Sequence, residues 1–156
     1  MEVSRIRVLR GPNLWSRHTA IEAIVACTED ERSISALPGF EDRLRALFPE
    51  IGLIQADSHE AQTSMAHALE YAALGLQAQA GCPVTFSRTA ATVEDGVFQV
   101  VVEYSEEEVG CLALSLAQAL LDAARHDRAF DLEAALAKLR KTDEDVRLGP
   151  STGAIV

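Results

Sequence analysis

The stretch TSMAHALEYAALGLQAQAG, residues 63–81, decides the fold of this chain. It contains no proline, lysine or arginine, and its apolar residues recur at helical spacing, so we predict a helix through the middle of the fold. At about 100° per residue, one face of this helix consists of Met65, Leu69, Ala72 and Leu76. Leu74 and Ala78 lie roughly opposite, so the helix is apolar nearly all round and should be buried.

The polar residues of this helix form one narrow stripe, which consists of Thr63, His67, Glu70 and Gln77. A carboxylate and an imidazole three residues apart on a buried helix must find partners, because an unpaired buried charge is strongly destabilising. One interpretation is that His67 and Glu70 form a hydrogen-bonded polar pair beside the core. The other is catalytic, because His67, Glu70 and Tyr71 read H-x-x-E-Y, one residue short of the zinc-binding pattern H-x-x-E-H. A phenol is a poor substitute for imidazole, so we predict no metal and no cofactor in this domain.

The composition is that of an ordinary globular protein with an acidic surface. The 156 residues fit one domain, and 48% of them are hydrophobic. The formal net charge of -10 argues against a general nucleic-acid binder and favours a cationic ligand. We expect Cys27, Cys82 and Cys111 to be reduced residues in or near the core of a cytoplasmic protein. No segment has the length of a membrane span or the apolar core of a signal peptide.

The residues before the central helix predict short elements. We expect strands over residues 3–9 and 20–27, a loop over 28–37, a helix over 40–48 and a brief strand over 51–56. In the first strand, Ile6 and Val8 should lie on one side and Arg5 and Arg7 on the other.

The residues after the central helix predict a hairpin followed by two helices. Strands over 84–86 and 97–104 should pair in antiparallel fashion around Glu94-Asp95-Gly96. A capping box formed by Ser105 and Glu108 should begin the first helix, which ends near Arg125, and Asp131 should cap the second. From Thr142 the chain turns polar, so we place the domain at 1–147 and a linker at 148–156.

These elements predict an α+β fold, in which a small, mainly antiparallel sheet packs against a central buried helix and two C-terminal helices. Several segments taken together resemble the N-terminal domain of cyanophycin synthetases. They are LRGPNLWS (9–16), LPGF (37–40), the helix with His67-x-x-Glu70, SRT (87–89), VVVEY (100–104) and LGPST (148–152). They span nearly all of the chain in the expected order.

The resemblance implies a module of an ATP-dependent ligase that builds cyanophycin, multi-L-arginyl-poly-L-aspartate. In that family an ATP-grasp domain and a Mur-ligase-like domain follow, and these use ATP and magnesium. The linker would lead to the ATP-grasp domain, and we expect a homo-oligomeric full-length protein. The N-terminal domain would hold the polymer without catalysis. We expect Arg7 and Arg88 to contact polymer carboxylates and Glu103 to contact a guanidinium group.

Two alternatives remain open. Some members of the family carry a zinc hydrolase site on the central helix that cuts cyanophycin into primers. Carried over to this chain, His67 would be a ligand, Glu70 the general base and Glu103 a possible further ligand, while Tyr71 replaces a histidine. The second alternative is a structural domain that docks the ligase domains.

Overall fold

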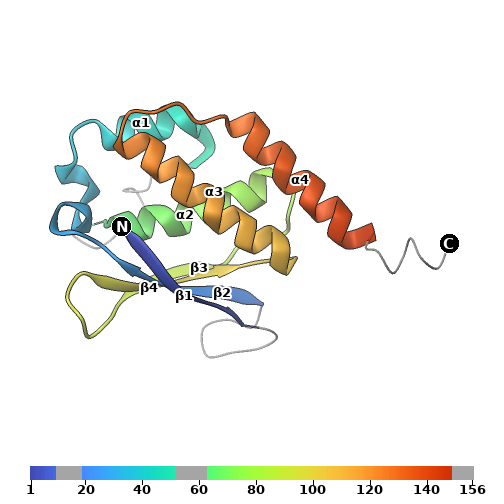
Figure 1. The fold of residues 1–156 in the computed structure, drawn as a ribbon, viewed down its shortest axis with the longest axis horizontal. Helices are drawn as coiled ribbons and strands as arrows, with labels where there is room; N and C mark the ends of the chain where they lie inside the picture. Colours follow the sequence, from blue (N-terminus) through green and yellow to red (C-terminus); the bar gives the residue numbers. More distant parts are fainter. Residues whose placement is uncertain (10–18, 52–62, 149–156) are drawn as a thin grey trace.

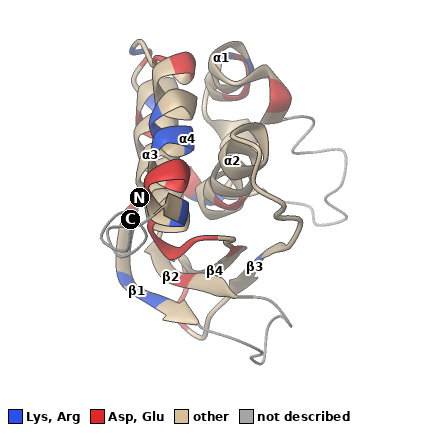
Figure 2. Cartoon of the chain, turned by 90° about the vertical axis from the view of Figure 1, so that its right-hand side faces the viewer, with Lys and Arg blue, Asp and Glu red and all other residues tan. Residues whose placement is uncertain are grey.

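The computed structural model describes residues 1–9, 19–51 and 63–148, and its architecture is α+β (Figure 1). A four-stranded sheet has the strand order β1-β2-β4-β3, and all of its pairs are antiparallel. The strands are β1 (Glu2–Leu9), β2 (Ala20–Ala26), β3 (Ser87–Ala91) and β4 (Val97–Glu103). The α-helices are α1 (Phe40–Leu47), α2 (Met65–Gln79), α3 (Glu107–Arg125) and α4 (Leu132–Leu148). The helices form a layer over one face of the sheet (Figure 2).

Helix α2 is the centre of this layer, as the sequence predicted. Ser64 caps its first turn, and most of the helix is buried, including Leu69 and Leu76 at 0% exposure. It packs against α3 on one side and against β3 and β4 on the other. A helix that contacts two layers must be apolar nearly all round, which explains the composition of residues 63–81.

Helix α3 lies close to the sheet because it carries a glycine where the two approach. A Cβ atom added at Gly110 would lie 2.6 Å from Tyr104 Cβ and 2.8 Å from Ile21 Cδ1. Only glycine allows this approach without a shift of the helix. Helix α4 packs on α3, and Asp131 Oδ1 accepts a hydrogen bond from the amide of Ala134 as predicted for its cap.

Several predicted boundaries were wrong. The first strand of the hairpin begins at Ser87 rather than at residue 84, because the amides of Thr85 and Phe86 bind the Glu103 carboxylate instead of a neighbouring strand. The capping box is not formed: α3 begins at Glu107 and its N-cap residue Glu106 makes no side-chain capping bond.

Other corrections concern length and exposure. Helix α4 continues to Leu148, well past Thr142, from which the chain turns polar. The predicted loop 28–37 contains two short 3-10 helices, Glu29–Arg32 (η1) and Ile34–Ala36 (η2). Cys111 is exposed, whereas Cys27 and Cys82 are buried.

The alternation expected in β1 is interrupted. The register shifts between Ser4 and Arg7, Arg5 has a φ of 49°, and Ile6 is 50% exposed. A bulge of this kind moves the following side chains to the other face, so Ile6 does not reach the core.

Parts of the prediction fall outside the described residues. Of the strand expected over 51–56, only Ile51 is described, and it ends a 3-10 helix, Pro49–Ile51. The linker expected over 148–156 is described only at Leu148. Within the described segments, no helix is long and apolar enough to cross a membrane.

Candidate functional site

The histidine of the central helix takes part in the cap of that helix. The backbone amide of Ser64 donates to His67 Nδ1 at 3.2 Å, and the amide of His67 donates to Ser64 Oγ at 3.3 Å. This is the reciprocal arrangement of a capping box, with an imidazole in the place of the usual Glu or Gln. The ring also meets Phe98 of β4 edge-on at a centroid distance of 6.0 Å. His67 therefore fixes the start of α2 beside the sheet.

The glutamate of the same helix is buried and binds the sheet. Glu70 Oε1 accepts a hydrogen bond from Ser87 Oγ at 2.7 Å, and Oε2 accepts one from Thr89 Oγ1 at 2.5 Å. Both hydroxyls belong to β3 and point to the helix-covered face. The carboxylate thus joins α2 to an edge strand through two charge-assisted hydrogen bonds. In one of our two interpretations His67 and Glu70 formed a hydrogen-bonded pair. Instead, His67 is bonded to Ser64, and the two oxygens of Glu70 are bonded to hydroxyls of β3.

The described residues of the alternative zinc site do not form a metal-binding set. The described residues contain no group of three His, Cys, Asp or Glu side chains that could hold a metal ion. Glu103, the proposed further ligand, accepts from the amides of Thr85 at 2.7 Å and Phe86 at 3.1 Å through Oε1. Tyr71, in the position of the second histidine, is half-buried. These side chains do not fit a three-ligand zinc site.

The face of the sheet opposite the helices carries all three residues that we expected to bind a polymer, Arg7, Arg88 and Glu103. Arg7 pairs with Glu22, Glu22 with Val101, and Val101 with Arg88, so these four residues form one row across all four strands. Cross-strand partners share a face, and Arg88 alternates with Ser87 and Thr89, whose hydroxyls face α2. The row therefore lies on the face opposite the helices.

The ends of this row are open and its middle is buried. Arg7 Nη2 lies 3.1 Å from Glu22 Oε2, and the Arg7 side chain is 66% exposed while that of Glu22 is 8% exposed. Arg88 is exposed at the other end. Glu22 was not among the predicted site residues, although an acid within the apolar run AIEAIVAC was a visible signal for a buried ion pair.

Glu103 lies on the same face, one row further along, where its partner on β2 is Ala20. It is only 6% exposed, and its carboxylate already binds the two amides before β3. Glu103 therefore shares the face of Arg7 and Arg88, but its carboxylate fixes the start of β3.

The thiols are not activated for nucleophilic chemistry. Burial raises the pKa of Cys27 and of Cys82 above the usual range. Burial, together with the nearby Glu107, also raises the pKa of Cys111. A raised pKa keeps the thiol protonated, and the thiolate is the reactive form.

Comparison with known proteins identifies the family of this chain. Residues 23–126 match the family described as the cyanophycin synthase-like N-terminal domain. The chain belongs to this family. Cyanophycin synthetase from Trichormus variabilis is 36% identical over an alignment that covers 100% of this chain and 19% of the relative. Cyanophycin synthetase from Synechocystis sp. is 33% identical over 100% of the chain and 20% of the relative. The chain thus spans about a fifth of the length of these relatives.

Proposed function

We propose that this domain binds cyanophycin and anchors the polymer to an ATP-dependent ligase. The ligase reaction would take place in ATP-grasp and Mur-ligase-like domains of the same protein, with ATP and magnesium bound there. The observation that supports the anchoring role best is the row Arg7–Glu22–Val101–Arg88 on the sheet face opposite the helices. It presents two exposed arginines at opposite edges of one sheet.

The chemistry of the polymer suits such a row. Cyanophycin carries guanidinium groups and carboxylates in alternation along its length, so its receptor should offer charges at more than one point. Strands lie about 4.8 Å apart, so three spacings separate the backbones of Arg7 and Arg88 by about 14 Å. Two separated arginines can bind two repeats of one polymer, and weak contacts on a repeating ligand reinforce one another.

Glu103 has a positioning role in this proposal rather than a contact role. Its carboxylate is buried and accepts two amide hydrogen bonds, so a polymer guanidinium would have to displace both. By holding Thr85 and Phe86 it fixes the start of β3, on which Arg88 lies two residues further along.

Co-sedimentation of the 156-residue chain with insoluble cyanophycin tests the anchoring role. We expect retention at low salt and its loss at high salt, because exposed ion pairs are screened. Replacing Arg7 and Arg88 together with alanine should weaken retention about tenfold, since each exposed contact contributes up to about 1 kcal/mol. Arg147→Ala is the matched control, because it removes one exposed arginine from the distant helix α4. Failure of the unmodified chain to sediment with the polymer at low salt would overturn the proposal.

The same assay measures the rival hydrolase activity. Polymer length in the pellet and zinc content per chain are recorded for the unmodified protein and for Glu70→Gln. Binding without shortening is the expected result. Shortening that stops in Glu70→Gln, together with about one zinc per chain, would instead establish the primer-making enzyme.

A further inference from the structure

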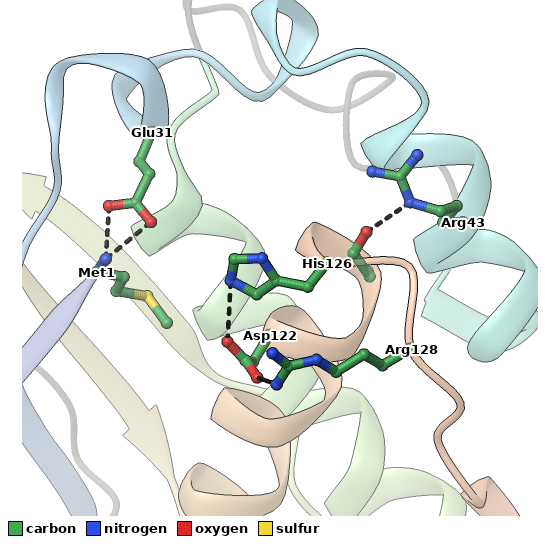
Figure 3. Close-up of polar contacts among 7 residues, drawn as sticks. Met1, Glu31, Arg43, Asp122, His126 and Arg128 are labelled. Atoms are coloured by element: carbon green, nitrogen blue, oxygen red, sulfur yellow. Dashed lines mark hydrogen bonds and ion pairs between the residues drawn. The ribbon is translucent and has the colours of Figure 1, made fainter.

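A cavity of about 450 Å³ lies away from the sheet face, at the C-terminal end of α3. Its walls come from the last turns of α3, the short helix η1, the first residue of α2 and Met1. Of the lining residues, Figure 3 shows Met1, Glu31, Asp122 and His126. The polar lining residues include Glu31, Gln118, Asp122, Arg125 and His126, and Met65 and Leu121 contribute apolar surface. None of the lining residues belongs to the row on the opposite sheet face. The volume is within the range of small-molecule sites.

The helix end beside this cavity already binds guanidinium groups. Arg43 Nε donates to the carbonyl oxygen of Ala124 at 2.6 Å, and Arg128 Nη1 donates to Asp122 Oδ2 at 3.2 Å (Figure 3). The C-terminal end of a helix carries partial negative charge, which favours cations there. The Arg128 contact is open to solvent, with side chains 66% and 55% exposed, so a competing cation can replace it at little cost.

The same wall offers a cation for a carboxylate. Arg125 lines the cavity and is half-buried, and it has no hydrogen bond or ion pair with any described residue. It follows Asp122 by three residues, a spacing that places both on one side of the helix. His126 Nε2 lies 3.4 Å from Asp122 Oδ1, so Asp122 is also oriented from the next turn.

The acid on the facing wall is already neutralised. Both carboxylate oxygens of Glu31 accept from the Met1 amino group, at 2.6 and 2.7 Å, and the amide of Thr28 donates to Oε1. Although burial alone would raise it, these bonds lower the pKa of Glu31 below its ordinary value. This leaves Asp122 and Arg125 as the charges available to a ligand.

We propose that this cavity binds an arginine-type zwitterion. The guanidinium group of the ligand pairs with Asp122 in place of Arg128, and its carboxylate pairs with Arg125. The ligand can be free arginine or an arginyl unit of the polymer; only the second source rests on the proposed function.

Titration of the 156-residue chain with L-arginine, followed by amide chemical shifts, tests this site. We expect saturable shifts at the end of α3 with a Kd on the order of 1 mM, as for a ligand held by two partly exposed ion pairs. Agmatine lacks the carboxylate, and L-citrulline has a neutral ureido group in place of the guanidinium group, so each should bind about tenfold more weakly. Asp122→Asn and Arg125→Gln should weaken arginine binding to a similar extent. Asp143→Asn on α4 is the matched control and should leave it unchanged.

Three results would overturn the inference. They are the absence of a saturable shift with L-arginine, binding of agmatine and citrulline as tight as that of arginine, and unaltered arginine binding by folded Asp122→Asn and Arg125→Gln variants. Thermal unfolding of each variant establishes that it is folded. A β-aspartyl-arginine dipeptide separates the two sources, because competition by it supports the polymer unit, and binding of arginine without such competition supports the free amino acid.

The two proposals fail in different ways. If the cavity binds no arginine while cyanophycin still retains the chain, only this inference falls. If arginine binds but the polymer does not retain the chain, only the anchoring role falls.

Discussion

The two faces of the sheet use their charged residues differently. On the helix-covered face, Glu70 is buried, and each of its carboxylate oxygens accepts a hydrogen bond from a hydroxyl of β3. On the opposite face, Glu22 is also buried, but its partner is Arg7, a side chain that is 66% exposed. The first carboxylate joins two elements of the interior, whereas the second holds a cation at the surface.

The difference lies in how each buried carboxylate is satisfied. A buried charge must be satisfied locally, and the protein satisfies Glu70 with neutral hydroxyl donors, one on each carboxylate oxygen. A carboxylate paired with an exposed arginine leaves that arginine accessible to a ligand. In our proposal the sheet face binds the polymer, and the link between α2 and β3 stabilises the fold.

The largest effect should come from removing the interior carboxylate. Glu70→Ala leaves the hydroxyls of Ser87 and Thr89 without their acceptor and should lower the free energy of unfolding by about 3 kcal/mol. Glu70→Gln keeps one acceptor and should cost about 1 kcal/mol. Urea unfolding of both variants measures this. Equal stability of Glu70→Ala and the unmodified chain would show that the helix-covered face does not depend on this link.

A somewhat smaller loss of stability should follow from adding a side chain where α3 approaches the sheet. Gly110→Ala places a methyl group 2.6 Å from Tyr104 Cβ and should cost about 2 kcal/mol. Gly75→Ala is the matched control, because its methyl group would lie 3.2 Å from the Phe48 ring edge and alanine is the better helix former. Thermal unfolding should separate the two, and a Gly110→Ala protein as stable as Gly75→Ala would mean that α3 is not tightly seated.

On the opposite face the stability effects should be lower. Arg7→Ala removes the partner of Glu22 and should cost about 1 kcal/mol, because the arginine is largely exposed. Adding Glu22→Gln should recover part of this loss. A double-mutant cycle in urea gives the coupling energy of the pair. No coupling between the two positions would remove the structural basis of the row.

The smallest effect concerns a third carboxylate and is seen in how the free energy of unfolding changes with pH. Glu31 has a lowered pKa in the folded state, so the stability it contributes is present above its ordinary pKa of 4.5 and is lost as the pH falls through the folded value. The free energy of unfolding should therefore fall less with decreasing pH in Glu31→Gln than in the unmodified chain. Identical pH profiles below 4.5 would show that the bonds from Met1 and Thr28 do not stabilise the fold.

The sequence predicted most elements because their signals are local. The apolar period of residues 63–81, the β-branched run of β4 and the Asp131 cap each lie within one element, and the structure confirms them. The failed boundaries have distant causes. Residues 84–86 do not form a strand because Glu103 takes two of their amides, and β1 loses its alternation at a bulge against β2.

By itself the sequence determined the fold class, the family and the identity of the charged residues. Only the tertiary structure decided which partner each charged residue finds. Glu70 binds the Ser87 hydroxyl, Arg7 pairs with Glu22, and Arg43 binds a backbone carbonyl at the end of α3. The reason is that helical and strand periods are set by neighbouring residues, whereas strand register and helix docking join residues far apart in the chain. Which side of the sheet an arginine occupies follows from that register, and so does its availability to a ligand.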